Sequence, residues 1–314
     1  MINKLMKNLN KKNILIISVI FLFSFSFLFY YFRPVTDPDS TFSILFIDVG
    51  QGDSALVECD GHWMLIDGGK GEESDKIYTI LKDRQVDHLD VIIGTHAHED
   101  HIGGLAGALN YATADRTLCP VTEYDSKAFN NFVKYSDRNG GGITIPEVND
   151  HFRLGSAEVK VIAVNSAEGV NNSSIVIRID YGKTSFLFTG DAEREQEQVI
   201  LDSKADIDAD LLKVGHHGSN SSTGYVFLRE IMPEYAVISC GKENEYGHPD
   251  EAVLSRLNDA DVQIFRTDLQ GDILCTSDGR KLTFTVEKNE KGEGLWEPGI
   301  PMKRKKLKNV RNGK

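Results

Sequence analysis

Three histidines and one aspartate lie within six residues of the sequence, in the order His-x-His-x-Asp-His. They are His96, His98, Asp100 and His101, and they follow the apolar segment 89–95. Imidazole and carboxylate groups are good ligands for zinc and related first-row ions. A strand that ends at these residues would fix their backbone before a metal binds. We therefore predict a metal site here, and not a solvated, histidine-rich turn.

Two other apolar segments end in residues of the same kinds. Asp191 ends one of them, and His216 and His217 end the other. One cluster cannot fill the coordination shells of two ions, so we expect Asp191 to bridge two ions and the histidine pair to contribute. The alternatives are that Asp191 caps a helix beginning at Ala192 and that the histidine pair forms a polar turn.

Strands and helices alternate along the chain in a way that could bring these segment ends together. The dipeptides Asp60-Gly61 and Gly182-Lys183 predict tight hairpins between apolar segments. Apolar spacing predicts helices at about 72–85, 101–112, 127–136, 192–202, 224–232 and 249–259. Strands are expected at about 41–49, 54–59, 62–67, 89–95, 157–164, 174–181, 184–191, 209–215, 235–241, 263–268, 272–277 and 281–287. This mixture predicts an α/β fold, in which helices cover two mixed sheets in one four-layer domain from about 41 to 288.

The first 37 residues are expected to lie outside that domain. Four lysines precede the uncharged segment 14–32, which has 19 residues, and about 20 apolar residues span a bilayer as a helix. The lysines should stay on the cytoplasmic side. We therefore predict one uncleaved transmembrane helix, with the folded domain outside the cytoplasm at the cell membrane. The alternative is a cleaved signal peptide and a secreted protein.

Charge divides the chain into the same parts. Of the total charge of −12, residues 1–37 carry +4 and residues 303–314 carry +7, which leaves −23 on residues 38–302. We predict a cytoplasmic stub and anchor at 1–37, a folded domain at 38–290, and a basic tail at 291–314 that is disordered or binds an anionic surface. An acidic body repels polyanions at long range, which disfavours nucleic acid as a partner.

The cluster around His96, followed by Thr-Gly-Asp at Asp191 and by Gly-His-His-Gly-Ser, resembles the metallo-β-lactamase superfamily. The segments FIDVGQGDS (46–54), KVGHHGS (213–219) and YGHP (246–249) are similar to the hydrolase domain of ComEC-type competence proteins, a branch related to teichoic acid phosphorylcholine esterase. The resemblance covers about residues 41–288 in the right order. It implies an αββα sandwich with a dinuclear site where the two sheets meet. It also implies one or two zinc ions, or manganese in their place.

The resemblance assigns roles to individual residues. It implies metal ligands at His96, His98, Asp100, His101, Asp191 and His217. His216 is then a catalytic or substrate-facing group, although the Gly-His-Gly pattern of the family aligns with either histidine of the pair. Many members have a further ligand histidine before the bridging aspartate, and this chain has Asn171 and Asn172 in that region. We therefore expect one asparagine to face the site and the second ion to bind more weakly.

The resemblance also implies a mechanism, in which a metal-bound hydroxide attacks the substrate. Such a hydroxide forms because the ion lowers the pKa of its bound water to roughly 7. Asp100 should orient the nucleophile, and His216 or His248 should assist the leaving oxygen. We expect His248 at a helix start, where the helix N-terminus would also attract a phosphate oxygen. Further substrate-facing or supporting positions are expected at Asp48, Asp53, Asp67 and Tyr246.

Together these inferences predict a membrane-tethered, extracytoplasmic and monomeric enzyme. Its leading substrate is an anionic phosphodiester, cleaved in a nuclease-like reaction or in a cell-wall polymer. The alternative reactions are hydrolysis of lactams, lactones or thioesters, because a fold alone does not choose between them. The alternative from another class is a binding module that keeps a metal site without catalysis.

Overall fold

The computed structural model describes residues 41–288 of the 314-residue chain. The predicted transmembrane helix at 14–32 and the basic tail at 291–314 lie outside the described residues. Within residues 41–288, no helix combines the length and the apolar character that crossing a bilayer requires.

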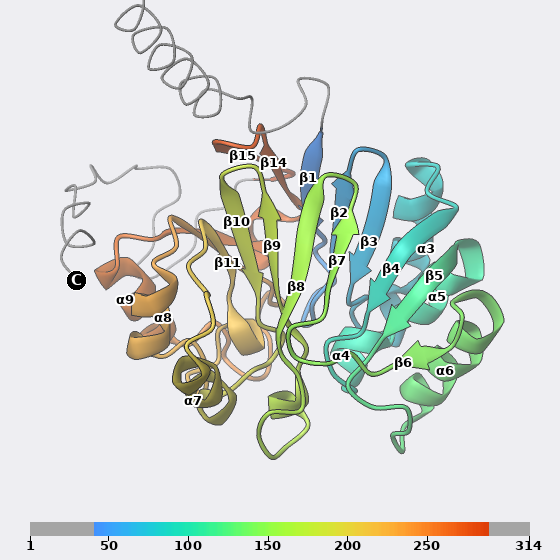
Figure 1. Cartoon of the computed structure of the whole chain (residues 1–314), viewed down its shortest axis with the longest axis horizontal. Helices are drawn as coiled ribbons and strands as arrows, with labels where there is room; N and C mark the ends of the chain where they lie inside the picture. Colours follow the sequence, from blue (N-terminus) through green and yellow to red (C-terminus); the bar gives the residue numbers. More distant parts are fainter. Residues whose placement is uncertain (1–40, 289–314) are drawn as a thin grey trace, which may run out of the picture. The chain divides into compact units, whose positions relative to one another are not determined.

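Two β-sheets face each other across a shared apolar core (Figure 1). The first has eight strands in the order β15-β14-β1-β2-β3-β4-β5-β6. They are β1 (Phe42–Phe46), β2 (Ala55–Cys59), β3 (His62–Ile66), β4 (His88–Ile93), β5 (Thr113–Leu118), β6 (Ile143–Thr144), β14 (Ile273–Ser277) and β15 (Leu282–Val286). The second has seven strands in the order β13-β12-β11-β10-β9-β8-β7. They are β7 (His151–Leu154), β8 (Ala157–Ala163), β9 (Val176–Tyr181), β10 (Thr184–Phe188), β11 (Leu211–Lys213), β12 (Tyr235–Ile238) and β13 (Gln263–Arg266).

Aromatic side chains from both sheets meet in the space between them. Phe46 of β1 stacks on Phe188 of β10 with ring centroids 5.8 Å apart, and Phe42 stacks on Phe186 at 4.8 Å. All four side chains are buried. Burial of one such side chain contributes about 1.5–3 kcal/mol to stability. These contacts therefore hold the two sheets face to face and fix the edge at which the predicted ligands lie.

Helices cover the outer face of each sheet, so the predicted four-layer αββα arrangement is confirmed (Figure 1). The first sheet packs against α3 (Ser74–Asp83), α5 (Leu105–Tyr111) and α6 (Lys127–Asn139). The second packs against α7 (Arg194–Ser203), α8 (Tyr225–Ile231) and α9 (Glu251–Asp259). The shorter helical segments are η2 (Gly71–Glu73), α4 (Glu99–Ile102), η3 (Asn171–Ser173), η4 (Gly215–Gly218) and α10 (Thr267–Gln270).

Three strands, β5, β6 and β7, were not predicted from the sequence. β5 exposes Thr113, Asp115 and Arg116, so its side chains do not alternate cleanly between apolar and polar. Its register comes from parallel pairing with β4, and such long-range pairing leaves little local pattern. β6 has two residues and β7 has four, which is too short for a period to be recognised.

The single helix predicted at 101–112 is wrong, because the chain forms α4 and α5 with a break at Gly103 and Gly104. The Gly104 N–H donates to the Gly69 carbonyl at 3.0 Å instead of continuing the helical ladder of α4. A Cβ atom at Gly104 would overlap the carbonyl oxygen of Gly68. The break therefore allows the backbone after the histidine cluster to approach the loop that follows Asp67.

Gly104→Ala should destabilise the protein by about 1–3 kcal/mol, because the new methyl group overlaps backbone that cannot move freely. Urea unfolding of the purified chain measures the change. Gly71→Ala is the matched control, since a Cβ atom there meets only ordinary contacts. It should change stability by less than about 0.5 kcal/mol. Equal stability of the two variants would contradict the close approach described for Gly104.

Candidate metal centre

Ligand-type side chains from three separate turns meet at the carboxyl ends of the central strands. β4 is followed by the turn 96–101, β10 is followed by Asp191, and β11 is followed by η4 with its two histidines. β10 and β11 are parallel neighbours, so their carboxyl ends share one edge of the second sheet. α4, which contains Asp100 and His101, lies at the lower edge of the sheets in Figure 1.

Asp191 lies at the centre of the cluster, and four imidazole rings direct the same nitrogen toward it. Its Oδ1 lies 3.2 Å from His101 Nε2. Its Oδ2 lies 3.7 Å from the Nε2 atoms of His96, His216 and His217. Four of these five side chains are buried, and His216 is 22% exposed. Asp191 does not cap the next helix, because α7 begins at Arg194.

The ligand atoms form two groups that share Asp191. One group also contains Asp53, His101 and His217, and the other also contains His96 and His98, whose facing ring nitrogens are 3.1 Å apart. A carboxylate shared by two such groups can bridge two ions. The structure thus brings together all the residues predicted as ligands: His96, His98, Asp100, His101, Asp191 and His217.

Two buried atoms at the centre indicate that a cation fits there. His101 Nε2 and Asp191 Oδ1 are buried and form an ion pair at 3.2 Å, but neither atom makes a well-aligned hydrogen bond within the described part of the chain. A buried polar atom without a partner costs about 1–3 kcal/mol. A divalent ion between the two atoms would satisfy both, and imidazole with carboxylate is a suitable donor set for zinc or manganese.

The orientation of the His217 ring distinguishes Asp100 from Asp53. His217 Nε2 lies 3.2 Å from Asp100 Oδ2, whereas His217 Nδ1 lies 3.1 Å from Asp53 Oδ1. The two nitrogens of an imidazole face in different directions, so an ion bound at Nε2 is on the Asp100 side. His101 is arranged in the same way, with Asp67 Oδ2 at 2.9 Å from its Nδ1. Asp53 and Asp67 therefore hold the ligand rings in place, as carboxylates commonly do for metal-binding histidines.

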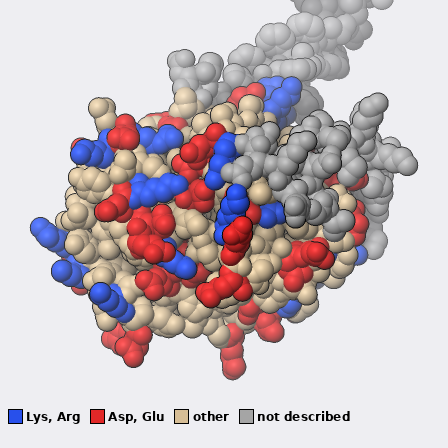
Figure 2. Space-filling view, turned by 180° about the vertical axis from the view of Figure 1, so that it is seen from behind, with Lys and Arg blue, Asp and Glu red and all other residues tan. Residues whose placement is uncertain are grey.

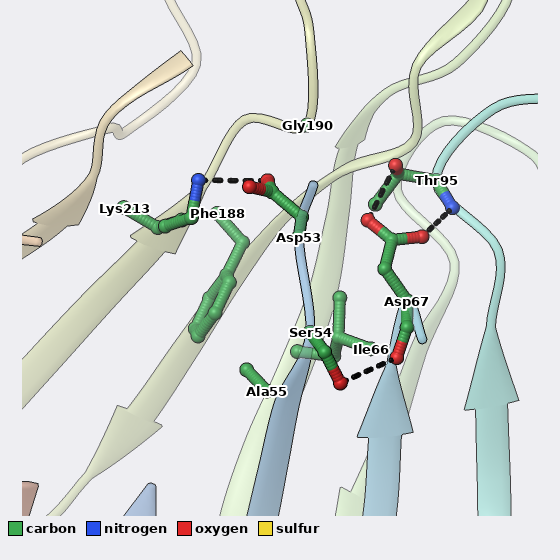
Figure 3. A pocket seen from close by; sticks show the side chains of 9 residues that line it. All are labelled: Asp53, Ser54, Ala55, Ile66, Asp67, Thr95, Phe188, Gly190 and Lys213. Atoms are coloured by element: carbon green, nitrogen blue, oxygen red, sulfur yellow. Dashed lines mark hydrogen bonds and ion pairs between the residues drawn. The ribbon is translucent and has the colours of Figure 1, made fainter. Parts of the chain in front are cut away.

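Each of these two supporting carboxylates has its own partner among the residues that line one pocket (Figure 3). Lys213 Nζ lies 2.7 Å from Asp53 Oδ2, and both side chains are buried. Thr95 donates to Asp67 through its N–H and its hydroxyl, each at 2.7 Å. A buried charge is costly unless it is paired, and Lys213 supplies the positive charge for Asp53.

The close packing of charges shifts the pKa values of the cluster strongly. Burial lowers the pKa of His217, but the carboxylates of Asp191 and Asp53 outweigh it and raise the pKa to about 10. Burial likewise lowers the pKa of His101, but the carboxylates of Asp191 and Asp67 outweigh it and raise this pKa well above its usual value. Against burial, His101 and His217 lower the pKa of Asp191 well below its usual value. In the metal-free protein, protons on these imidazoles therefore balance the buried carboxylates.

The turn that carries His216 and His217 has an unusual backbone. His216 has φ 48° and His217 has φ 53°, both in the left-handed region. Such a residue other than glycine costs on the order of 1–3 kcal/mol and is typical of functional sites. Here the two consecutive left-handed residues let both rings reach Asp191. His216 Nδ1 is held by Glu193 Oε1 at 3.2 Å and by Ser221 Oγ at 3.1 Å.

Asn172 and Asp48 make contacts that shape the loops near the site, whereas the Asn171 side-chain oxygen does not. Asn172 accepts from the Glu193 N–H at 3.0 Å and donates to the Glu168 carbonyl at 3.0 Å, which secures the start of α7. Asn171 has a buried Oδ1 without a hydrogen-bond partner in the described segment. Asp48 accepts from the Gly50 N–H at 3.3 Å and so shapes the loop that leads to Asp53.

His248 lies beside the histidine pair, but α9 begins later than predicted. The ring centroid of His248 is 5.7 Å from that of His216 and 6.4 Å from that of His217. Exposed Tyr246 stacks on His248 at 5.7 Å. α9 begins at Glu251, and the Asp250 side chain accepts from the Ala252 N–H. The expectation that His248 stands directly at the helix N-terminus is therefore wrong, because Asp250 caps the helix.

Several supporting residues were missed by the sequence reasoning. They are Gln51, Thr95, Glu193, Lys213 and Ser221. Lys213 did carry a signal, since it is a charged residue within the apolar segment 209–215. The others are ordinary polar residues whose partners lie elsewhere in the sequence.

Zinc binding at pH 7 should release about two protons for the first ion, because His101 and His217 must lose their protons before Nε2 can bind a metal. The affinity should fall as the pH falls, because protons then compete for the same nitrogens. It should rise with pH until His217 has lost its proton, near its metal-free pKa of about 10. Calorimetric titration with Zn²⁺ in buffers of different ionisation enthalpy counts the protons. Zinc binding without proton release would contradict the charged state described for the metal-free cluster.

Comparison with known proteins identifies relatives of the chain. It is 31% identical over 260 residues to ComE operon protein 3 of Bacillus subtilis, a match covering 76% of this chain and 34% of that protein. It is 29% identical over 258 residues to Competence protein ComA of Neisseria gonorrhoeae, covering 77% and 33% of the two chains. A shorter match, 33% identical over 91 residues, involves Ribonuclease Z of an Exiguobacterium species and covers 27% of this chain and 29% of that protein. The chain thus spans about a third of the length of the first two relatives.

The family assignment agrees with the geometry of the cluster. The sequence profile described as Metallo-beta-lactamase superfamily matches residues 47–242, which include the turn 96–101, Asp191 and His217. The chain therefore belongs to the metallo-β-lactamase superfamily, in the branch of the competence proteins.

Proposed function

We propose that this metal-dependent hydrolase cleaves phosphodiester bonds. The observation that carries the proposal is the third imidazole, His248, beside the histidine pair and outside the two ligand groups. A phosphodiester in the transition state carries more anionic oxygens than a lactam or a lactone. Extra hydrogen-bond donors beside the ions suit that charge, because preorganised donors stabilise charge as it develops. The short match to a protein named Ribonuclease Z gives further support.

The residues of the chain would share the work as follows. His96, His98, Asp100, His101, Asp191 and His217 would hold zinc or manganese. A bound ion supplies a nucleophile near neutral pH by lowering the pKa of water, and it polarises the phosphoryl oxygen. Asp100 would orient the attacking group, since its carboxylate is 26% exposed at the side of the buried histidines.

His248 and His216 would act on the side of the leaving group. Burial and the neighbouring His217 and His216 lower the pKa of His248. A neutral imidazole ring can donate through one nitrogen and accept through the other. His216 is oriented by Glu193 and Ser221 with its Nε2 toward Asp191. It can therefore assist the leaving oxygen or act as an additional ligand where the family histidine is missing.

The charge of the molecule favours a small or flexible substrate. Residues 38–302 carry a net charge of −23, and acidic and basic side chains are intermingled on the face shown in Figure 2. A duplex nucleic acid is usually held by a continuous basic surface. We propose a substrate that presents one phosphodiester to the ions, in a short or single-stranded polymer or in a cell-wall component.

The location of the activity is a further part of the proposal. Segment 14–32 would anchor a monomeric chain in the cell membrane, with the catalytic domain on the extracytoplasmic side. This part rests on the apolar character of residues 14–32 and the preceding lysines, and not on the described residues.

His248→Ala should lower phosphodiester turnover by about 10²–10⁴-fold, the usual contribution of one acid–base group, while the zinc content stays unchanged. Any cleavage of β-lactams or lactones should suffer less, because those substrates lack the additional anionic oxygen. The test uses the full chain with added Zn²⁺ or Mn²⁺ and a panel of nucleic acids, phosphodiester chromogens, phosphorylcholine esters, lactones and β-lactams.

His151→Ala is the matched control, since His151 is exposed at the start of β7 and lies outside the cluster. This variant should keep the full turnover. Activity of the unmodified protein on β-lactams or lactones alone would contradict the proposal. Loss of zinc from His248→Ala would instead make His248 a ligand.

A further inference from the structure

Gln51, in the middle of the Val-Gly-Gln-Gly-Asp motif, contacts His248 beside the metal centre. The Gln51 Oε1 accepts a hydrogen bond from the Gly241 N–H at 3.0 Å, and its Nε2 lies 3.4 Å from His248 Nδ1. These partners are 190 and 197 residues away in the sequence. The side chain therefore joins the loop after β1 to the loop between β12 and α9, which only the fold brings together.

The backbone around Gln51 leaves it little freedom to move. A Cβ atom at Gly52, the next residue in the chain, would overlap the Asp100 carbonyl oxygen. On the other side, a Cβ atom at Gly241 would overlap the backbone nitrogen of Gln51. The Asp53 N–H donates to the Asp100 carbonyl at 3.1 Å. The motif loop is thus pressed between the turn that carries the metal ligands and the loop that carries Gly241.

The backbone of His248 is fixed as well, so the ring has a defined neighbour. Its N–H donates to Asn244 Oδ1 at 3.0 Å, and its carbonyl accepts from Asn244 Nδ2. Tyr246 stacks on one side of the ring with an interplanar angle of 23°. His248 is therefore presented to Gln51 in one orientation.

The chemistry of the amide then decides which nitrogen of His248 carries the proton. A backbone N–H is only a donor, so the atom of Gln51 that faces Gly241 must be the acceptor oxygen. The atom that faces His248 is then the –NH₂ group, which has no lone pair to offer. His248 Nδ1 must accept, and the proton of the neutral ring resides on Nε2.

We propose that Gln51 is a positioning residue that fixes His248 in the Nε2–H tautomer and so makes Nε2 the donor for the substrate. The inference rests on the role of His248 in the proposed function. It explains why a side chain that can both accept and donate stands between the two glycines of the motif. It also makes the Nε2–H of His248 a defined hydrogen-bond donor while the ring stays neutral.

The test is the tautomer of His248, read by ¹⁵N NMR of the zinc-loaded full chain labelled at histidine. The His248 signal is identified by its loss in His248→Ala. The unmodified protein should show a neutral ring protonated at Nε2. Gln51→Glu keeps an acceptor for Gly241 but offers His248 only carboxylate oxygens, so it should move the proton to Nδ1 or charge the ring. Gln198→Glu, at an exposed position of α7, is the matched control and should leave the signal unchanged.

Activity provides a second and independent reading. Gln51→Glu should lower phosphodiester turnover toward the level of His248→Ala, about 10²–10⁴-fold below the unmodified protein. Added to His248→Ala, it should cost nothing further, because residues that act through one group are not additive. If Gln51 had only a structural role, Gln51→Glu would instead lower the activity of the unmodified protein and of the His248→Ala variant by the same factor.

The outcomes separate this inference from the proposed function. A His248 ring protonated at Nδ1 in the unmodified protein, or one that Gln51→Glu leaves unchanged, would overturn the role of Gln51. A different result would be the expected tautomer together with a phosphodiester turnover that His248→Ala does not change. This result would support the role of Gln51 and overturn only the proposed function.

Discussion

The structure of the site depends on one buried carboxylate, that of Asp191. It has four imidazole Nε2 atoms within 3.2–3.7 Å and lies in a region where an isolated anion would be very costly. In the metal-free protein, protonated histidines balance it. A divalent ion would replace those protons and use the same nitrogens. The fold therefore maintains a cluster that is complete only with positive charge, supplied either by protons or by metal.

The surrounding elements serve to keep that cluster in place. The strands β4, β10 and β11 end at the cluster, and consecutive left-handed residues after β11 direct two rings to the same point. Asp53 and Asp67 hold His217 and His101 from behind, and Lys213 and Thr95 hold those carboxylates in turn. Such outer partners commonly change metal affinity by about 10–100-fold. The stable αββα core thus holds in place a sheet edge that has a strained backbone and many closely spaced charged side chains.

Much of this arrangement could be predicted from the sequence, because apolar strands that end in ligand-type residues mark one edge of a sheet. That pattern gave the ligand turn, Asp191 and the histidine pair, while hairpin dipeptides and helical spacing gave the four layers. The pattern did not give β5, whose register depends on β4, or the break at Gly104, which depends on contact with Gly68. Gln51 and Lys213 were missed because their partners lie 190 and 160 residues away.

The most direct test of the account is the position of the metal in crystals of the protein grown with Zn²⁺, located by anomalous diffraction at the zinc edge. We predict an ion about 2.0–2.2 Å from the Nε2 atoms of His101 and His217 and from a carboxylate oxygen of Asp191. Asp53 should remain outside the coordination shell. Zinc bound at Nδ1 of His217 beside Asp53, or a fully loaded protein without zinc at Asp191, would contradict the account.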